Sequence, residues 1–180
     1  MLYSYKECKQ KYNSDYAIRK AIQSGEIIRI SRGVYSNTDA EMELSIIGKK
    51  YSYAVFTMNS AFYYHGLTDT VPSKYYLITD KDSTKIKDSR IVQYYDNDNS
   101  LKIGLEKKEY NGSIINIFSK ERMLVELIRH KNNLPFDYYK EIILNYRKIV
   151  YQLDIQAIQE YAQSLPKSKL VMKTLQLEVF

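Results

Sequence analysis

The first candidate site is a polar face on a helix expected near the N-terminus. At 100° per residue, four side chains spaced i, i+3, i+4 and i+7 fall within about a third of the circumference: Tyr16, Arg19, Lys20 and Gln23. The opposite side of the same helix is apolar, with Ile18, Ala21 and Ile22. An arginine can fork onto guanine, a glutamine onto adenine, and lysine or tyrosine can hold phosphates. The polar face therefore suits the major groove of DNA.

A short basic hairpin is expected directly after this helix. Two apolar runs, Ile27–Ile30 and Val34–Tyr35, flank a tip that contains Gly33, a residue that permits close approach to a surface. Arg29 and Arg32 lie in this segment. A helix-turn-helix followed by a basic hairpin is typical of a winged helix, in which the second helix enters the groove and the wing grips the backbone. A solvated surface and a protein-contact module are the alternatives that this pattern leaves open.

Local signals place these side chains on defined elements. Residues 3–11 are expected to form a first helix, which breaks at Asn13. Ser14 is a good N-cap for the second helix, and Asp15 stands in the first turn, where the helix dipole favours an anion. Gly25 suits the left-handed residue that ends a helix. We expect residues 1–37 to form a winged helix-turn-helix domain.

The remaining residues, 38–180, are expected to form a mixed α/β domain. Thr38 to Glu41 matches a capping box that would open a helix, and a further helix should run from Asn59 to Gly66. Residues 53–118 are β-rich, with strands expected at 53–56, 75–78, 91–95, 101–105 and 114–118, and a tight turn at Asn111–Gly112. From Ser119 the apolar period becomes helical, and four helices are expected in 119–180. The fold class is α+β.

Composition limits the possible partners. The chain has 180 residues, 27 Lys and Arg against 21 Asp and Glu, and a net charge of +6 that lies in residues 1–40 and 119–180. A basic excess favours an anionic partner such as nucleic acid. The single cysteine, Cys8, excludes an internal disulfide and a cysteine zinc site. With no apolar run near the ~20 residues that span a bilayer, and no signal peptide, we expect a cytoplasmic protein without a membrane partner.

A search for catalytic groups finds no strong candidate. His65 follows an aromatic cluster and His130 ends a helix, which are common places for structural histidines. Asp96 and Asp98, followed by Glu106-Lys107-Lys108, have the order of residues found in metal-dependent nucleases, but an Asp/Asn-rich turn and a solvated hairpin explain them as well. We expect no enzyme activity, cofactor or metal. A metal-dependent nuclease with a DNA-binding front end stays open as an alternative.

Three segments resemble a known family. Residues 18–22 continuing through 25–35 resemble the N-terminal winged helix of AbiEi-type antitoxins, which belong to bacterial abortive-infection toxin–antitoxin systems of type IV. Residues 60–67 and 119–127 also fit, and the segments occur in the family's order over most of the chain. Many relatives carry Thr and Asp where this chain has Met123 and Glu126, so a packing role is expected for that segment.

The resemblance implies a function in two parts. The winged helix would bind inverted repeats in double-stranded promoter DNA and repress its own operon. The contacts would come from Arg19, Lys20, Arg29 and Arg32. The C-terminal antitoxin domain, residues 38–180, would neutralise a nucleotidyltransferase-like toxin without needing a stable complex. A monomer or a weak cooperative dimer would fill the paired sites, and the basic C-terminal end could extend the DNA-facing surface. A sensor-type transcription factor without a toxin is the second alternative.

Overall fold

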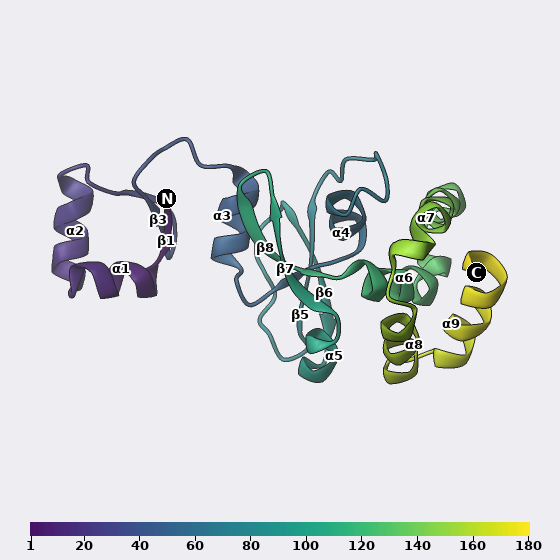
Figure 1. Cartoon of the computed structure of the whole chain (residues 1–180). Coiled ribbons are helices and arrows are strands. Elements are labelled where there is room, and N and C mark those ends of the chain that lie inside the picture. Colours follow the sequence, from purple (N-terminus) through teal and green to yellow (C-terminus); the bar gives the residue numbers. More distant parts are fainter. The chain divides into compact units, whose positions relative to one another are not determined.

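The computed structural model describes residues 1–180 as an α+β chain with nine α-helices and two β-sheets (Figure 1). The chain forms two compact units. The first contains Met1–Tyr53 and Lys107–Ile115, and the second contains Ala54–Glu106 and Asn116–Phe180. None of the helices combines the length and the apolar sequence that crossing a bilayer requires.

The first unit combines helices with a small antiparallel sheet in the order β1-β3-β2. Its elements are β1 (Leu2–Ser4), α1 (Tyr5–Tyr12), α2 (Asp15–Gln23), β2 (Ile28–Ser31), β3 (Val34–Ser36) and α3 (Glu43–Lys50). One apolar cluster lies beneath α1, α2 and the sheet and consists of Cys8, Ile18, Ala21, Ile27 and Tyr35. The expected second helix and the hairpin are confirmed to within one or two residues.

Two expectations for this unit are wrong. Leu2–Ser4 was expected partly as helix but forms a strand, because β3 offers it a free edge and pairs Tyr3 with Tyr35. The capping box at Thr38–Glu41 opens no helix: α3 begins at Glu43, after Met42. The carboxylate of Glu41 instead accepts a hydrogen bond from the Ser36 hydroxyl and pairs with the N-terminal ammonium at 2.8 Å. Because these tertiary contacts engage the Glu41 carboxylate, it is not available to the backbone N–H of Thr38, which a capping box requires.

The larger sheet is mixed and has five strands in the order β6-β5-β4-β8-β7. Its strands are β4 (Val55–Phe56), β5 (Tyr75–Asp80), β6 (Ile91–Asp96), β7 (Leu105–Tyr110) and β8 (Ser113–Phe118). The second unit contains β4, β5 and β6, whereas β7 and β8 are divided, because Lys107–Ile115 belong to the first unit. β5 is parallel to β6 and antiparallel to β4, and β4 is parallel to β8. The turn between β7 and β8 has positive φ at Asn111 and Gly112, as their sequence predicts.

Helices account for the rest of the second unit. They are α4 (Met58–Tyr64), α5 (Asp98–Lys102), α6 (Lys120–Arg129), α7 (Phe136–Ile149), α8 (Ile155–Ser164) and α9 (Ser168–Thr174). Two short 3₁₀ helices, η1 (Lys131–Asn133) and η2 (Val150–Gln152), and the π-helix η3 (Leu175–Val179) complete the set. α6 packs against α4, α8 and α9. Its apolar side chains Met123, Leu124, Leu127 and Ile128 are fully buried. Ser119 and Asp154 cap α6 and α8, so the expected helical end of the chain is confirmed.

One local prediction fails in this unit. Residues 101–105 do not form a strand: Asn97 accepts the backbone N–H of Ser100 at 2.9 Å and starts the short helix α5 there. The helix expected from Asn59 to Gly66 is confirmed to within one or two residues, since α4 begins at Met58, after the extended residue Thr57. At residues 97–105 an N-cap signal lies within a few residues of the apolar run. The choice between helix and strand depends on the neighbouring elements.

Candidate nucleic-acid interface

The helix α2 has one buried side and one exposed side. The Ser14 hydroxyl accepts the backbone N–H of Ala17 at 3.1 Å, which satisfies one free donor at the start of the helix. Ile18 and Ala21 are 3% and 5% exposed and anchor α2 to the core of the first unit. The opposite side consequently faces solvent. All four predicted side chains on it are exposed: Tyr16, Arg19, Lys20 and Gln23.

The chain turns from α2 into the hairpin through a short glycine turn. Gly25 has a φ of +76°, and the backbone N–H of Glu26 donates to the Ala21 carbonyl at 3.0 Å. Ile27 follows and is 1% exposed, which ties the start of β2 to the same core. Burial on both sides of the turn holds the helix and the hairpin in one arrangement within this unit.

The hairpin carries the other two predicted cations, Arg29 on β2 and Arg32 in the turn before β3. Gly33 has a φ of +79°, and its carbonyl accepts the backbone N–H of Tyr5 at 2.9 Å. The pairing of β2 with β3 is irregular between Arg29 and Ser31. Such a bulge increases the local twist of a strand. The side chains of Arg29 and Arg32 are both exposed.

The cations of the first unit fall into two groups. Three lysines pair with carboxylates: Lys9 with Asp15 at 3.0 Å, Lys11 with Glu26 at 3.8 Å and Lys49 with Glu7 at 2.7 Å. The Lys49 hydrogen bond lowers the pKa of Glu7 to about 2. In contrast, no salt bridge or side-chain hydrogen bond involves the predicted DNA-contacting cations Arg19, Lys20, Arg29 and Arg32. The same is true of Lys6, Lys107 and Lys108 in this unit.

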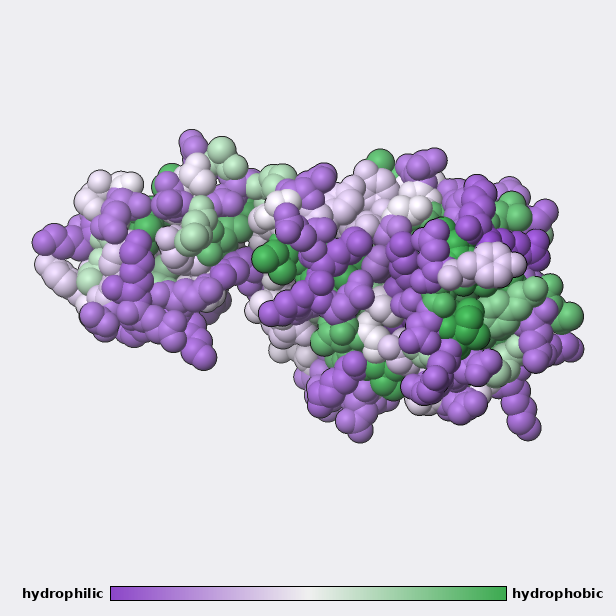
Figure 2. Space-filling view, in the orientation of Figure 1, coloured by the Kyte–Doolittle hydropathy of each residue, from purple (hydrophilic) through white to green (hydrophobic).

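α2 and the hairpin thus carry four of the cations of this unit that have no ionic partner. Asp15, at the start of α2, lies close enough to Arg19 to feel its charge, but it accepts hydrogen bonds from Tyr5 and Lys9 instead. Figure 2 shows hydrophilic side chains over much of the visible surface of α1 and α2. Cations without an internal partner are free to meet an external anion, since no ion pair has to break first.

The histidines that the sequence singles out have internal partners. His65 is 8% exposed, and its Nε2 lies 2.7 Å from the carbonyl oxygen of Phe118. The Nε2 of His130 lies 3.2 Å from a carboxylate oxygen of Glu126. Both histidines thus contribute to contacts within the second unit.

The acidic segment after β6 has local roles. Asn97 caps α5, and Asp98 pairs with Lys102 on the same helix. The chain contains no group of three or more His, Cys, Asp or Glu side chains arranged as metal ligands. Glu106 lies on β7 and does not belong to such a group.

The segment around residues 119–127 forms a buried ionic cluster. Arg122 is 0% exposed, and its Nε donates to Glu126 at 2.9 Å. Its Nη1 donates to the carbonyls of Ser100 and Ile103 at 2.9 and 3.1 Å. The guanidinium also lies over the ring of Phe118, 4.5 Å from its centroid. These contacts give the segment the packing role expected for it, because they attach α6 to the chain just before β7.

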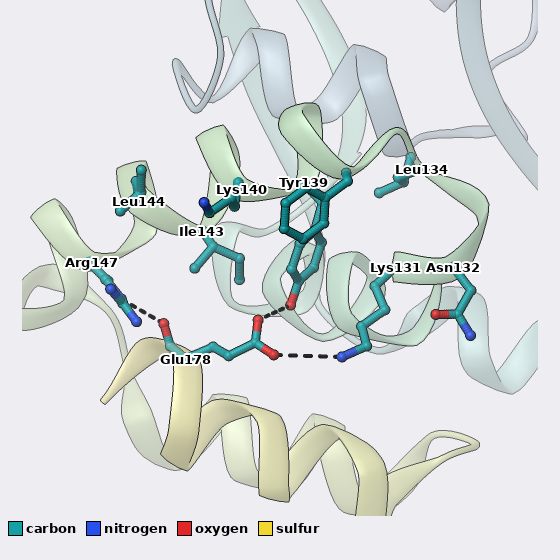
Figure 3. A pocket seen from close by; sticks show the side chains of 10 residues that line it. Lys131, Asn132, Leu134, Tyr139, Lys140, Ile143, Leu144, Arg147 and Glu178 are labelled. Carbon is teal, nitrogen blue, oxygen red and sulfur yellow. Dashed lines mark hydrogen bonds and ion pairs between the residues drawn. The ribbon is translucent and has the colours of Figure 1, made fainter.

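Sequence reasoning missed a pocket in the second unit. Its volume is about 480 Å³, and side chains from η1, α7 and η3 line it (Figure 3). One feature of the sequence pointed to this surface: Phe136, Lys140 and Leu144 are spaced four residues apart and so lie on one face of α7. In the structure both apolar residues of this set are exposed. The opposite wall comes from Glu178, which is more than thirty residues farther along the chain. The sequence pattern contains no sign that this residue returns to α7.

The comparisons with known proteins bear on the fold. No family model matches the chain, and no curated protein matches it. Among solved structures, a crystal structure of the RV2827C protein from Mycobacterium tuberculosis is similar, with a TM-score of 0.61 and 11% sequence identity. The match covers 98% of this chain and 71% of that chain. At this identity, the likeness shows that the two chains share a fold.

Proposed function

We propose that this chain is a DNA-binding antitoxin of the AbiEi type that represses its own operon. In this proposal residues 1–37 act as a winged helix-turn-helix, with α2 as the recognition helix and the β2–β3 hairpin as the wing. The observation that carries the proposal is the set of exposed cations without internal partners on these two elements: Arg19, Lys20, Arg29 and Arg32. The larger C-terminal part would neutralise a nucleotidyltransferase-like toxin.

The side-chain chemistry of α2 supports a division of labour on a duplex. Arg19 and Gln23 lie one helical turn apart on the exposed side, and these residue types pair with guanine and adenine edges in the major groove. Lys20 and Tyr16 have groups that hold phosphates. The arginines of the hairpin would grip the backbone beside the groove. Phosphate contacts release counterions, so binding by this surface must weaken as salt increases.

The antitoxin part rests on the resemblance of the sequence over most of the chain. In such a system the chemistry belongs to the toxin, and the antitoxin needs no catalytic cluster of its own. The neighbouring gene provides an inexpensive check. A co-directional nucleotidyltransferase gene immediately downstream supports the proposal, and its absence favours a transcription factor without a toxin.

The decisive experiment reverses the charge of α2 in the full-length chain. The test variant is Arg19→Glu with Lys20→Glu. The control is Lys85→Glu with Lys87→Glu, an equal change of charge at two exposed positions in a loop of the second unit. Fluorescence anisotropy would measure binding to a duplex from the chain's own promoter across a salt series. We expect the α2 variant to bind at least about tenfold more weakly and its log–log salt slope to fall by about one, because Lys20 is the phosphate-holding cation of the pair.

The same variants separate the two parts of the function. Co-expression with the neighbouring toxin should show neutralisation by the wild type and by both variants, because α2 is not in the C-terminal part. Circular dichroism checks that each variant folds. DNA binding by a folded α2 variant that equals that of the wild type would disprove the assignment of α2 as the recognition helix.

A further inference from the structure

The pocket in the second unit has an apolar wall and a cationic edge. α7 contributes Tyr139 and Ile143, which are 6% and 5% exposed and line the pocket. Leu144 and Phe136 also line it and are 49% and 69% exposed, so apolar surface remains open to solvent there. A volume of about 480 Å³ lies within the range of about 300–1,000 Å³ that is typical of small-molecule sites.

The only carboxylate in the lining is already neutralised. Glu178 reaches from η3 toward α7, where its carboxylate accepts the hydroxyl of Tyr139 at 2.7 Å and lies 3.6 Å from the ammonium of Lys131 (Figure 3). Burial and, after it, the hydrogen bond to Glu178 raise the pKa of Tyr139, so its hydroxyl stays a donor. Glu178 therefore closes one side of the pocket and leaves little free negative charge.

Two cations of the lining have no carboxylate partner. Arg147 uses Nε to donate to the backbone carbonyl of Glu178 at 2.6 Å, and its two terminal nitrogens make no hydrogen bond within the chain. Lys140 is exposed and lies over the ring of Phe136, 5.3 Å from its centroid, without an ion pair. With Lys131, the lining holds three cations and one carboxylate, so it carries a positive excess beside an apolar wall.

We propose that this pocket binds a small amphipathic anion, a molecule with an apolar body and one carboxylate or similar acid group. The apolar body would lie against Ile143 and Leu144, where burial of apolar surface stabilises the complex. The acid group would take the terminal nitrogens of Arg147, which can bind a carboxylate through two parallel hydrogen bonds. A fully polar anion would leave the apolar wall exposed, and a cation would face the positive excess.

The test uses the full-length chain and decanoate, a ten-carbon carboxylate, kept below the concentration at which it forms micelles. Isothermal titration calorimetry would compare it with decyltrimethylammonium, which has the same chain length and the opposite charge. Leu144→Glu places a carboxylate at an exposed position in the pocket, and Arg147→Gln removes the cation. Tyr151→Glu is the matched control, because Tyr151 is 100% exposed and outside the lining.

We expect saturable binding of decanoate by the wild type and by Tyr151→Glu, and binding at least about tenfold weaker by Leu144→Glu and Arg147→Gln. Decyltrimethylammonium should bind at least about tenfold more weakly than decanoate. The absence of saturable binding, equal binding of the two probes, or unchanged binding by Leu144→Glu would each overturn the proposal. The assay contains no DNA, so its outcome is independent of the function proposed for α2.

Discussion

Replacing Arg122 by methionine tests the buried ionic cluster of the second unit. Methionine keeps most of the length of the side chain and removes the charge and the donors. In the wild type, Arg122 makes hydrogen bonds to Glu126 and to the carbonyls of Ser100 and Ile103, with no exposure to solvent. The substitution leaves a buried carboxylate with fewer partners and removes a donor from each of two backbone carbonyls.

The expected cost is large for a single substitution. Removing one partner of a buried ion pair destabilises a protein by about 3–5 kcal/mol. We therefore expect the free energy of unfolding to fall by about 4 kcal/mol, because Arg129 and His130 still contact Glu126 and keep the loss within that range. At about 2–4 °C per kcal/mol for a chain of this size, the melting temperature should fall by roughly 10 °C.

The control is an ion pair with the same spacing on the surface. Lys102 and Asp98 are also four residues apart on a helix, but their side chains are 66% and 65% exposed. Lys102→Met should cost less than about 1 kcal/mol, because solvent screens an exposed pair. Thermal and urea unfolding followed by circular dichroism at 222 nm would measure both variants. The double variant Arg122→Met with Glu126→Met should regain part of the loss, since it no longer buries a poorly paired charge.

If Arg122→Met and Lys102→Met lower the free energy of unfolding equally, the buried cluster does not hold α6 to the chain before β7. In that case the packing role assigned to residues 119–127 is wrong.

Two further predictions concern the same region. Gly104 and Gly66 have φ of +67° and +68°, but a Cβ on Gly104 would lie 2.5 Å from the Cβ of Arg122, whereas a Cβ on Gly66 meets nothing within 4 Å. In urea unfolding, Gly66→Ala should therefore lower the free energy of unfolding by about 1 kcal/mol, and Gly104→Ala should lower it by about 1–3 kcal/mol more. If the two variants lose the same amount, the close approach of Gly104 to Arg122 is not present in the protein. Burial raises the pKa of Glu126, but the His130 hydrogen bond and neighbouring cations outweigh it and lower that pKa from 4.5 to about 2. The stability that this lowered pKa contributes is present above pH 4.5 and is lost as the pH falls toward 2. Between these pH values, the free energy of unfolding of Glu126→Gln should therefore depend less on pH than that of the wild type. A pH profile equal to that of the wild type would refute the lowered pKa of Glu126.

Local interactions explain the parts of the fold that the sequence determined by itself. Ser14 caps α2, and Ser119 and Asp154 cap the helices that follow them, because each side chain bonds an N–H only three residues away. Gly25 and Gly33 take positive φ where the sequence requires turns. The helical period also identified which side of α2 would be buried. The exposure of the four predicted side chains on α2 was predictable for the same reason.

Only the tertiary structure decided the elements whose partners lie far away in sequence. Leu2–Ser4 became a strand because β3 offered an edge, and Glu41 left its capping motif for Ser36 and the N-terminus. The same holds for the pairing of the cations in the first unit and for the pocket in the second. The four free cations differ from Lys9, Lys11 and Lys49 only because folding brings carboxylates to those lysines. The pocket exists only because Glu178 returns to α7 and accepts the hydroxyl of Tyr139. A local sequence pattern cannot predict a contact between residues more than thirty positions apart.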